Sequence, residues 1–521
     1  MVAARDSARP ATEVELKLAF DPADAARLAS HPALEASLVP PEEHELVSIY
    51  FDTLDCALHK AGVYLRIRKS AGSFVQTVKS ARSKTELLER FEWEREISSR
   101  TPDLDGVEGT PLQPLLTPQV RASLQPVFET RIRRNIHRIE RDGSEIEIAI
   151  DCGDIATRTH TRPVCEVELE LKRGEKKALF SLARIMAETV PLRLEVKTKA
   201  ERGYELLQDE ALKAEKAAEI DIAPEMRSGE AFRAIALSCL RQIVANEPAM
   251  CAGQAEALHQ MRIGLRRLRA AISVFADVVG DDEAERIKAE LKWITRELGP
   301  ARDLDVFATD VLAPLRESHP EDQAIAASHR DFEERRAAAY ISAAGSVRSD
   351  RFRTAMLDLA AWVETAPWAA DNDKQRKTLR PRAVAKHAKK ELGRLRKRIR
   401  RKGADLRHRS VRQRHRLRIR AKRLRYATEF FAGTFPGEAS AKCRVESLSA
   451  LKDLQDALGG LNDLATRHAL VAEEMEGDAG DTEKSQPASR LAADGAEGET
   501  LLLKAEQAFA RFAGTKPFWK A

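Results

Sequence analysis

Between residues 11 and 210 the chain alternates repeatedly between charged and apolar side chains. In the stretch ATEVELKLAF, which begins this region, every second side chain is charged: Glu13, Glu15 and Lys17. A β-strand sends alternate side chains to opposite faces, so this stretch predicts a strand with one charged and one apolar face. A single strand of this kind is most simply a surface strand with a solvated face.

The same alternation recurs in short runs separated by turn signals, such as the Asp-Gly pair at 142–143. Two helical segments interrupt it, near 22–29 and 175–190. The pattern predicts an antiparallel, mainly β domain. Its runs are SIYFDT (48–53), VYLRIRKS (63–70), SFVQTVKS (73–80), ERFEWEREI (89–97), FETRIRRNIHRIER (128–141), SEIEIAID (144–151), CEVELELKR (165–173) and LRLEVKTKAERGY (192–204).

The charges on these runs are sorted by sign. A solvated sheet face usually mixes Ser, Thr, Gln and Asn among its charges, whereas here carboxylates and cations segregate onto different strands. A sandwich with a wet outer face is one possible fold. A barrel closed with the charged face inward is the other, and it would form a tunnel in which Arg and Lys hold phosphate oxygens and carboxylates hold hard divalent cations.

At these residues the chain resembles the CYTH family, also called triphosphate tunnel metalloenzymes, over about residues 11–210. The resemblance implies an eight-stranded tunnel that hydrolyses triphosphates with Mg²⁺ or Mn²⁺. It rests on an ordered set of motifs: EVELK (13–17), YLRIR (64–68), TVK (77–79), RFEWE (90–94), EVELE (166–170) and KAERGY (199–204).

The resemblance also implies roles for single residues. The metal ligands would be Glu13, Glu15, Asp151, Glu166 and Glu168. The phosphate chain would be held by Lys17, Arg66, Arg68, Lys79, Arg131, Arg133, Lys197 and Arg202. Some relatives use a lysine as the base on the strand where this chain has Arg131, and an arginine stays protonated. We therefore expect the base to be a metal-bound water or a carboxylate such as Glu92 or Glu94, with Lys17 and Arg131 as further catalytic residues.

Beyond residue 225 the apolar period becomes helical, and the sequence repeats itself. HQMRIGLRRLRAAISVF (259–275) and HRLRIRAKRLRYATEFF (415–431) align without a gap, 156 residues apart. Downstream, LGPARDLDVF (298–307) echoes LGGLNDLATR (458–467). The sequence therefore predicts an all-α bundle that is built twice, so that the whole chain is an α+β multidomain protein.

Each copy of the repeated helix carries a histidine and basic residues at +3, +7 and +10, within an arc of roughly 80° on an ideal helix. The two faces are His259, Arg262, Arg266 and Arg269, and His415, Arg418, Lys422 and Arg425. Like charges this close destabilise a helix unless something neutralises them, so we expect a bound anion. Metal binding by these histidines is a weaker explanation than anion binding, because no second His, Cys or acidic residue stands at ligand spacing beside either one.

This half resembles CHAD, the conserved-histidine α-helical domain, through the paired helices and the KPFW motif at 516–519. By resemblance, that family binds inorganic polyphosphate. The predicted layout is a CYTH-like domain at 11–211, a linker at 212–227 and a CHAD-like domain at 228–518, with repeats at about 228–370 and 376–518 and an acidic flexible loop at 473–499.

The charge distribution agrees with a polyanionic partner. Residues 374–425 contain 25 Lys and Arg against 2 acidic residues, although the net charge of the whole chain is only +5. Nucleic acid is disfavoured, because no helix-turn-helix or zinc motif occurs and stacking aromatics are nearly absent there. The six cysteines are scattered without a CxxC, and no apolar run or signal peptide is present, so we expect a cytoplasmic protein with no membrane partner.

These features together predict a metal-dependent inorganic triphosphatase, converting triphosphate and water to diphosphate and phosphate, with a polyphosphate-binding helical domain. An enzyme for an organic triphosphate, such as thiamine triphosphate or ATP, is an alternative. The low aromatic content of 5% gives no base or thiazole pocket that the sequence can locate. A non-catalytic polyphosphate-binding protein is the other alternative, and the full set of acidic residues argues against it.

Overall fold

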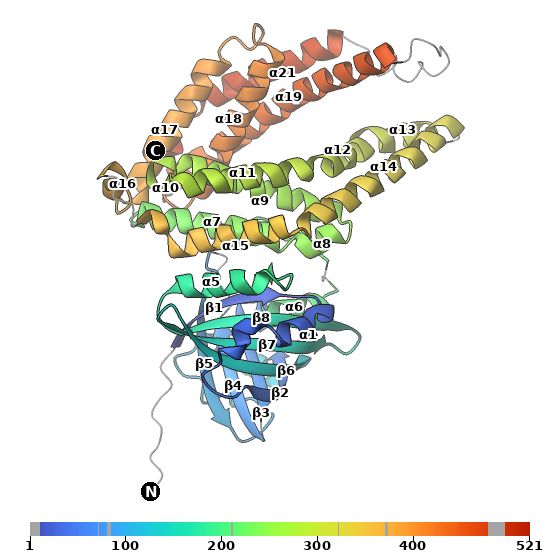
Figure 1. The fold of residues 1–521 in the computed structure, drawn as a ribbon. Coiled ribbons are helices and arrows are strands. Elements are labelled where there is room, and N and C mark those ends of the chain that lie inside the picture. Colours follow the sequence, from blue (N-terminus) through green and yellow to red (C-terminus); the bar gives the residue numbers. More distant parts are fainter. Residues whose placement is uncertain are drawn as a thin grey trace. The chain divides into compact units, whose positions relative to one another are not determined.

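The chain folds into two compact units in a computed structural model (Figure 1). The first unit comprises residues up to 218, 236–266 and 281–367, and the second comprises 219–235, 267–280 and 368–521. Across the described residues, no helix has both the length and the apolar character that crossing a membrane requires. The structure describes residues 11–70, 72–80, 85–209, 212–320, 322–369, 374–477 and 495–521.

Eight strands of the first unit close into an antiparallel barrel, as predicted. Their order is β5-β4-β3-β2-β6-β7-β8-β1, and β1 also pairs with β5, which closes the ring. A two-residue strand, β9, extends the sheet beside β1. The strands are β1 (Ala11–Ala19), β2 (Glu42–Asp52), β3 (Val63–Ser70), β4 (Ser73–Ser80), β5 (Glu89–Ile97), β6 (Gln125–Arg141), β7 (Ser144–Ala156), β8 (Thr161–Arg173) and β9 (Arg193–Leu194).

The apolar face of the alternating strands points outward and is covered by other elements. Leu16 on β1 and Leu169 on β8 are fully buried, and helix α5 (Lys176–Ala187) packs against both strands. On the far side, Leu65 and Val78 join one apolar cluster with residues of the segment that follows β5. The barrel is therefore stabilised by apolar burial on its outside, which leaves its inside free for charges.

The last predicted strand is mostly a helix. Only Arg193–Leu194 are extended as β9, and Lys199–Leu207 form helix α6. The Thr198 side chain accepts a hydrogen bond from the Glu201 backbone N–H, and the Glu201 side chain accepts one from the Thr198 N–H. The prediction of a strand through KAERGY was wrong, because this capping box starts a helix at that point.

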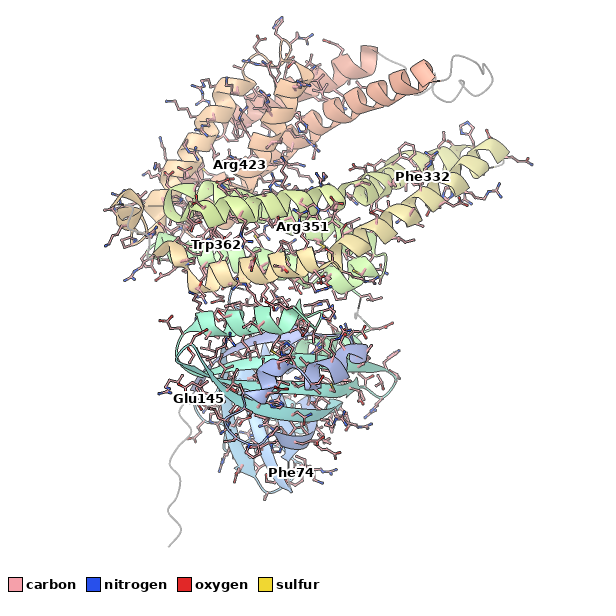
Figure 2. All side chains as sticks on the ribbon, in the orientation of Figure 1. Phe74, Glu145, Phe332, Arg351, Trp362 and Arg423 are labelled. Carbon is pink, nitrogen blue, oxygen red and sulfur yellow. The ribbon has the colours of Figure 1, made fainter. Side chains whose placement is uncertain are left out.

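The remaining helices form the repeated half of the chain, and the two predicted helices are α9 (Ala255–Val274) and α18 (Val411–Phe430). The other long helices are α7 (Ser228–Val244), α11 (Asp282–Glu297), α12 (Gly299–Phe307), α14 (Gln323–Val347), α15 (Asp350–Thr365), α17 (Val384–Gly403), α19 (Glu438–Gly477) and α21 (Gly495–Gly514). Aromatic residues pack among them. Arg351, labelled in Figure 2, lies 4.1 Å from the ring centre of Trp293.

Shorter helices join these elements. They are α1 (Ala25–Ala29), α2 (Pro32–Glu35), α3 (Ala57–Lys60), α4 (Pro118–Ser123), α8 (Glu247–Cys251), α10 (Ala276–Val279), α13 (Ala313–Ser318) and α16 (Lys374–Leu379). Of the predicted acidic loop at 473–499, residues 473–477 end α19 and residues 495–499 begin α21, while 478–494 lie outside the described residues. The domain and repeat limits given above stay predictions.

Equivalent positions of the two repeats meet each other within the second unit. Arg227 and Ala383, 156 residues apart, form an antiparallel bridge, and the rings of Phe275 and Phe431, also 156 apart, lie 5.7 Å from each other. A two-fold symmetry axis produces self-complementary contacts of this kind. A local two-fold axis therefore relates these parts of the two repeats within the second unit. The bridge is flanked by two equivalent bonds, Ser228 N–H to Arg382 O (3.0 Å) and Val384 N–H to Met226 O (2.8 Å).

The close contact between α6 and the barrel generates a stability prediction. A Cβ atom at Gly203 would lie 2.2 Å from Cε2 of Phe128. We expect Gly203→Ala to lower the free energy of unfolding of the barrel by about 1–3 kcal/mol, the usual cost of overpacking a core. Urea unfolding followed by circular dichroism measures the effect.

Gly345→Ala in α14 is the matched control, because no other heavy atom lies within 4 Å of its Cβ position. This change should be neutral or should stabilise the helix by up to about 1 kcal/mol. Equal unfolding curves for the two variants would contradict the tight packing of α6.

Candidate active site

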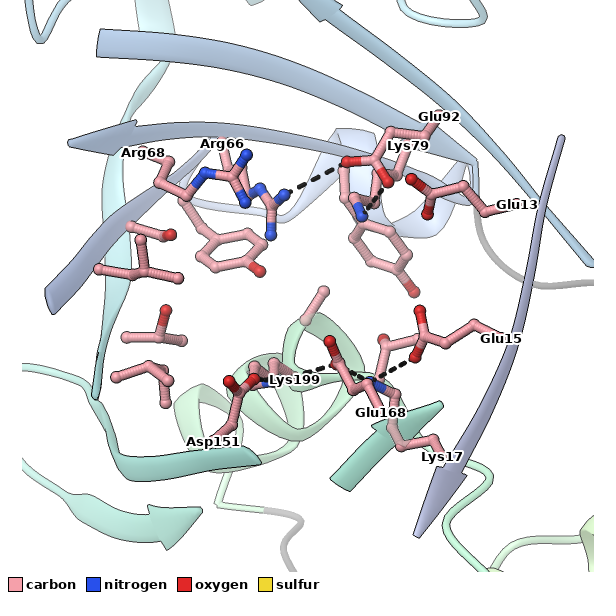
Figure 3. Close-up of a pocket in the computed structure, with 18 of the residues that line it drawn as sticks. Glu13, Glu15, Lys17, Arg66, Arg68, Lys79, Glu92, Asp151, Glu168 and Lys199 are labelled. Atoms are coloured by element: carbon pink, nitrogen blue, oxygen red, sulfur yellow. Dashed lines mark hydrogen bonds and ion pairs between the residues drawn. The ribbon is translucent and has the colours of Figure 1, made fainter. Parts of the chain in front are cut away.

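The barrel encloses a cavity of about 160 Å³ whose wall is dominated by charged side chains (Figure 3). Two groups of side chains face each other across it, one around Arg66 and Glu92 and the other around Lys17 and Glu168. The charged faces predicted from the alternation therefore line one interior space. Its carboxylates are Glu13, Glu15, Glu92, Glu94, Asp151, Glu168 and Glu170, and its cations are Lys17, Arg66, Arg68, Lys79, Arg134 and Lys199.

Three carboxylates of β7 and β8 form an acidic cluster. One oxygen from each of Asp151, Glu166 and Glu168 can be chosen so that all three lie within 4.8 Å of one another. Asp151 and Glu166 are directly opposite in the β7–β8 register, and both are fully buried. Buried carboxylates need partners, because losing their water costs several kcal/mol per ion.

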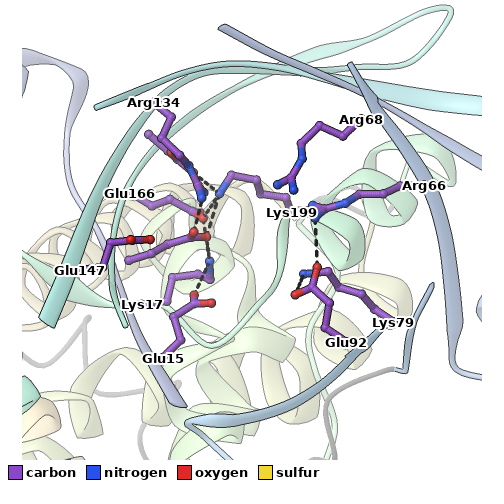
Figure 4. A network of polar contacts seen from close by, with 12 residues as sticks. Glu15, Lys17, Arg66, Arg68, Lys79, Glu92, Arg134, Glu147, Glu166 and Lys199 are labelled. Carbon is purple, nitrogen blue, oxygen red and sulfur yellow. Dashed lines mark hydrogen bonds and ion pairs between the residues drawn. The ribbon is translucent and has the colours of Figure 1, made fainter. Parts of the chain in front are cut away.

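Cations from three other elements supply these partners (Figure 4). Lys17 Nζ on β1 lies 2.9 Å from Glu166 Oε1 and contacts Glu168 more closely. Lys199 Nζ at the start of α6 lies 2.6 Å from Asp151 Oδ2 and 3.0 Å from Glu168 Oε1. The cluster is thus held by a strand and a helix that are far apart in sequence.

Two arginines complete the network. Arg134 on β6 donates to both oxygens of Asp151, from Nε at 2.7 Å and from the terminal nitrogen at 2.6 Å. Arg202 on α6 donates to Glu166. Burial alone would raise the pKa of Glu166, but Lys17, Lys199 and Arg202 lower it to about 2. Glu166 is therefore ionised at neutral pH.

The opposite wall has a smaller network. Lys79 Nζ lies 2.6 Å from Glu92 Oε2, and Arg66 donates to the other oxygen at 3.3 Å. Burial raises the pKa of Glu92, but these two cations outweigh it and hold the pKa well below the usual range. Glu94 is more exposed, accepts a bond from Thr77 at 2.9 Å and lies 3.2 Å from Arg68.

Glu13 has a different environment from the other acids of the cavity. Burial is the main cause that raises its pKa, to about 8, and the nearby Glu92 adds to the effect. Lys79 opposes the shift without cancelling it. Among the described side chains, Lys79 is the cation that acts on Glu13, whereas Asp151, Glu166 and Glu168 each contact at least two cations.

Four of the predicted phosphate-binding residues do not line this cavity. Arg131 and Arg133 point to the outside of β6, where their side chains are 61% and 65% exposed and Arg131 pairs with Glu129. Thr130, Ile132 and Arg134 form the inner face of β6 instead, and substrate contact by Arg131 and Arg133 stays a prediction. Lys197 and Arg202 line a second, smaller cavity instead.

Arg134 and Lys199 are cations of the cavity wall that the sequence prediction did not include among its site residues. Arg134 directly follows Arg133 in the sequence. Because Arg131 and Arg133 alternate with Ile132, the pattern predicted that these two arginines form the charged inner face. The signal for Lys199 was the Thr198–Glu201 capping box, which places Lys199 in the first turn of a helix. Ten other predicted residues line the cavity, and Glu166 belongs to the acidic cluster without lining it. The ten are Glu13, Glu15, Lys17, Arg66, Arg68, Lys79, Glu92, Glu94, Asp151 and Glu168.

The basic faces of α9 and α18 lie as the helical period predicts. The apolar positions Leu265 and Leu424 are buried, whereas Arg262 and Arg418 are only half-buried. Within the described residues, the buried Nε atoms of both arginines make no hydrogen bond. Each arginine also lies beside the first glycine of its LG motif, since a Cβ at Gly299 or Gly459 would lie 3.7 Å from Arg262 or 3.4 Å from Arg418.

Comparisons with known proteins match two family models to separate parts of the chain. The CYTH domain model matches residues 11–204, and the CHAD domain model matches residues 234–472. An inorganic triphosphatase of Haemophilus influenzae is 32% identical over 202 residues, 37% of this chain and 54% of that protein. The chain thus spans about half the length of the curated relative it matches.

Solved structures are similar to each half. A CHAD domain from the plant Ricinus communis has 29% identity and a TM-score of 0.47, covering 57% of this chain and 96% of that one. A putative adenylyl cyclase from Hippeastrum with a dominant triphosphatase activity has 19% identity and a TM-score of 0.29, covering 37% of this chain and 95% of that one.

The two faces of β6 provide a test of the ion-pair network. We expect Arg134→Ala to lower the free energy of unfolding by about 3 kcal/mol, because it removes one partner of a mostly buried pair. Arg131→Ala removes the same side chain from the exposed face and should cost less than about 1 kcal/mol. Denaturant unfolding of both variants measures the difference, and equal losses would show that Arg134 is not the structural partner of Asp151.

Proposed function

We propose that this chain, which carries a CYTH domain followed by a CHAD domain, is a metal-dependent inorganic triphosphatase whose helical half binds polyphosphate. The charge of the barrel cavity carries the proposal. Among the described side chains, seven carboxylates and six cations line it, so these residues offer no excess of positive charge to a triphosphate. A polyanion needs additional cations there, and divalent metal ions would supply them.

The carboxylates of the cavity fit such metal ions. Mg²⁺ and Mn²⁺ prefer oxygen ligands, and the cluster of Asp151, Glu166 and Glu168 offers three carboxylates within a few ångströms. Glu13 and Glu15 add two more from β1, and Glu13 has too few cationic neighbours to stay ionised without one. When bound, a divalent ion would neutralise phosphate charge and lower the pKa of a water molecule.

The cations of the cavity would bind and orient the phosphate chain. Arg66, Arg68 and Lys79 form one wall, and Arg134 and Lys199 form the other (Figure 4). Positioning of this kind, together with charge neutralisation, provides most of the catalysis in phosphoryl transfer. Lys17 contacts three carboxylates and would hold them in place.

Of the two carboxylates that we expected as a base, Glu94 is the better candidate. Glu92 is held by Lys79 and Arg66, which keep its pKa low and make it a poor proton acceptor. Glu94 is 39% exposed at its side chain and can reach a water molecule.

The aromatic residues of the wall favour an inorganic chain over a nucleotide or thiamine compound. Tyr50 and Tyr64 are the tyrosines of the cavity, and they are only 4% and 5% exposed. Tyr50 also stacks on Phe128 with ring centres 4.4 Å apart. Neither ring therefore offers an open face on which a base could stack, which ranks an organic triphosphate below the inorganic one.

Polyphosphate is the ligand that we propose for the basic faces of α9 and α18. Arg262 and Arg266 have buried Nε atoms without hydrogen bonds in the described part of the chain, and Arg418 repeats the arrangement. Leaving buried donors unpaired costs about 1–3 kcal/mol each, and a phosphate chain would satisfy them. Burial, followed by Arg302, lowers the pKa of His259, and a bound anion would raise it.

The metal proposal leads to a test in the barrel. We expect Glu13→Gln or Glu15→Gln to reduce triphosphate hydrolysis more than about 100-fold. Mutation of a residue that only hydrogen-bonds to a metal ligand already lowers metal affinity or activity by about 10–100-fold. Glu140→Gln on the exposed part of β6 is the control and should keep full activity. Phosphate release should also stop in EDTA and return with Mg²⁺ or Mn²⁺, and full turnover in chelator would contradict the proposal.

The polyphosphate proposal leads to a second test. We expect joint replacement of Arg262, Arg266, Arg418 and Lys422 by Ala to weaken polyphosphate binding by about two orders of magnitude, because four charge-assisted contacts are lost. Triphosphate turnover should survive. Binding should strengthen as the pH falls toward 6, where the histidines become charged beside the anion. Filter binding at several salt concentrations, with duplex DNA as competitor, measures these effects.

A control variant distinguishes polyphosphate binding at the histidine helices from nonspecific binding to exposed basic residues. It replaces four exposed cations of α17 with Ala, namely Lys386, Lys389, Lys397 and Lys402. If this control loses as much affinity as the first variant, or if DNA competes equally per phosphate, the histidine helices are not a specific site.

A further inference from the structure

A second cavity lies outside the barrel interior, where the segment after β9 meets the end of α7 and the start of α8. It has a volume of about 30 Å³. A water molecule needs roughly 10–15 Å³, so the space suits about two waters or one small ion. Two residues that the sequence predicted as phosphate ligands, Lys197 and Arg202, are part of its wall.

The wall of this cavity carries an excess of cations. Five basic residues line it, Arg162, Arg193, Lys197, Arg202 and Lys213. Among the described lining residues, the carboxylates are Glu195 and Glu247. Glu205 forms an ion pair with Lys197, with Nζ 2.5 Å from Oε1. The lining therefore favours an anion and disfavours a metal ion.

Several donors at this wall have no hydrogen bond. Arg202 has a side chain that is only 8% exposed, and its Nε atom has no hydrogen-bond partner among the described residues. One terminal nitrogen of Arg162 is also buried and has no hydrogen-bond partner among the described residues. It lies 4.0 Å from the nearest oxygen of Glu205. Buried guanidinium donors are costly to leave unsatisfied, so a group that accepts hydrogen bonds is expected between them.

The carboxylates of the wall leave room for such a group. Glu195 lies 3.8 Å from Arg202, and Glu247 lies 3.5 Å from Arg193, so both pairs are longer than an ordinary hydrogen bond. Burial raises the pKa of Glu247 to about 7. Near neutral pH this residue is therefore partly protonated, and a protonated carboxyl donates a hydrogen bond.

We propose that this cavity binds a single small tetrahedral oxyanion of the orthophosphate class, held by Arg162, Arg193 and Arg202. A guanidinium meets two oxygens of such an ion with its planar fork, which suits three arginines around one anion. The site is separate from the barrel cavity and does not require the proposed hydrolysis, although that reaction would release the same ion.

Arg202 links the two sites. It donates to Glu166 of the acidic cluster with one terminal nitrogen, and it is also one of the residues that line the second cavity. An anion on Arg202 would therefore share this side chain with Glu166. The position of Arg202 connects occupancy of the second cavity to the charge balance of the acidic cluster.

Crystals of the full chain, grown without phosphate or sulfate and soaked in selenate, test the proposal. Selenate has the shape of phosphate, and its anomalous signal locates it. We expect a peak within hydrogen-bond distance of Arg162 and Arg202 that millimolar phosphate displaces. A second cavity that holds only water molecules after the soak would overturn the proposal, whatever the barrel cavity contains.

Solution binding with matched variants gives an independent readout. Equilibrium dialysis with radioactive phosphate should show one bound ion fewer per chain in the double variant Arg162→Gln, Arg193→Gln than in wild type. The control is Arg131→Gln, Arg133→Gln, which removes two exposed arginines and should keep the full number. Equal numbers in both variants would also overturn the proposal, while triphosphate hydrolysis, measured separately, reports on the proposed function.

Discussion

The buried ion-pair network inside the barrel is the constraint on which the first unit depends. Asp151 and Glu166 are fully buried, and such groups are tolerated only when cations are held against them. Lys17 on β1 and Lys199 on α6 meet that need, although they are 182 positions apart. Closure of the barrel and the start of α6 must therefore both be correct before the charges balance. This dependence also keeps the acids close together, which is the arrangement that a divalent ion requires.

Apolar burial acts on the opposite face of the same strands. Leu16 and Leu169 are covered by α5 on the outside, so the hydrophobic effect stabilises the barrel without filling its interior. At one end, Ala200 and Tyr204 of α6 pack with Phe128 in an apolar cluster. The interior is therefore apolar where the helix enters and charged elsewhere. A cavity with polar walls survives there because packing energy comes from other surfaces.

The helical half uses symmetry to form its core. Arg227 bridges Ala383, and Phe275 contacts Phe431, so the same residues of two repeats meet around one local axis. A duplicated bundle of this kind presents its basic helix face twice. Buried arginine donors that make no hydrogen bond to any described residue occur on both α9 and α18, as two similar anion sites would require.

The sequence by itself determined the alternating strands, the gathering of charge on one strand face and the repeated helices, because these depend on local periods of 2 and 3.6 residues. It predicted ten residues that line the barrel cavity. Tertiary structure decided which face of β6 turns inward, since Arg131, Arg133 and Arg134 are all charged and only closure of the barrel distinguishes them. It also decided that the chain turns into α6 after β9, which moves Lys197 away from the cavity and brings Lys199 in. Periodicity fixes the relative faces of neighbouring residues, but the assignment of a face to the interior depends on contacts between distant segments.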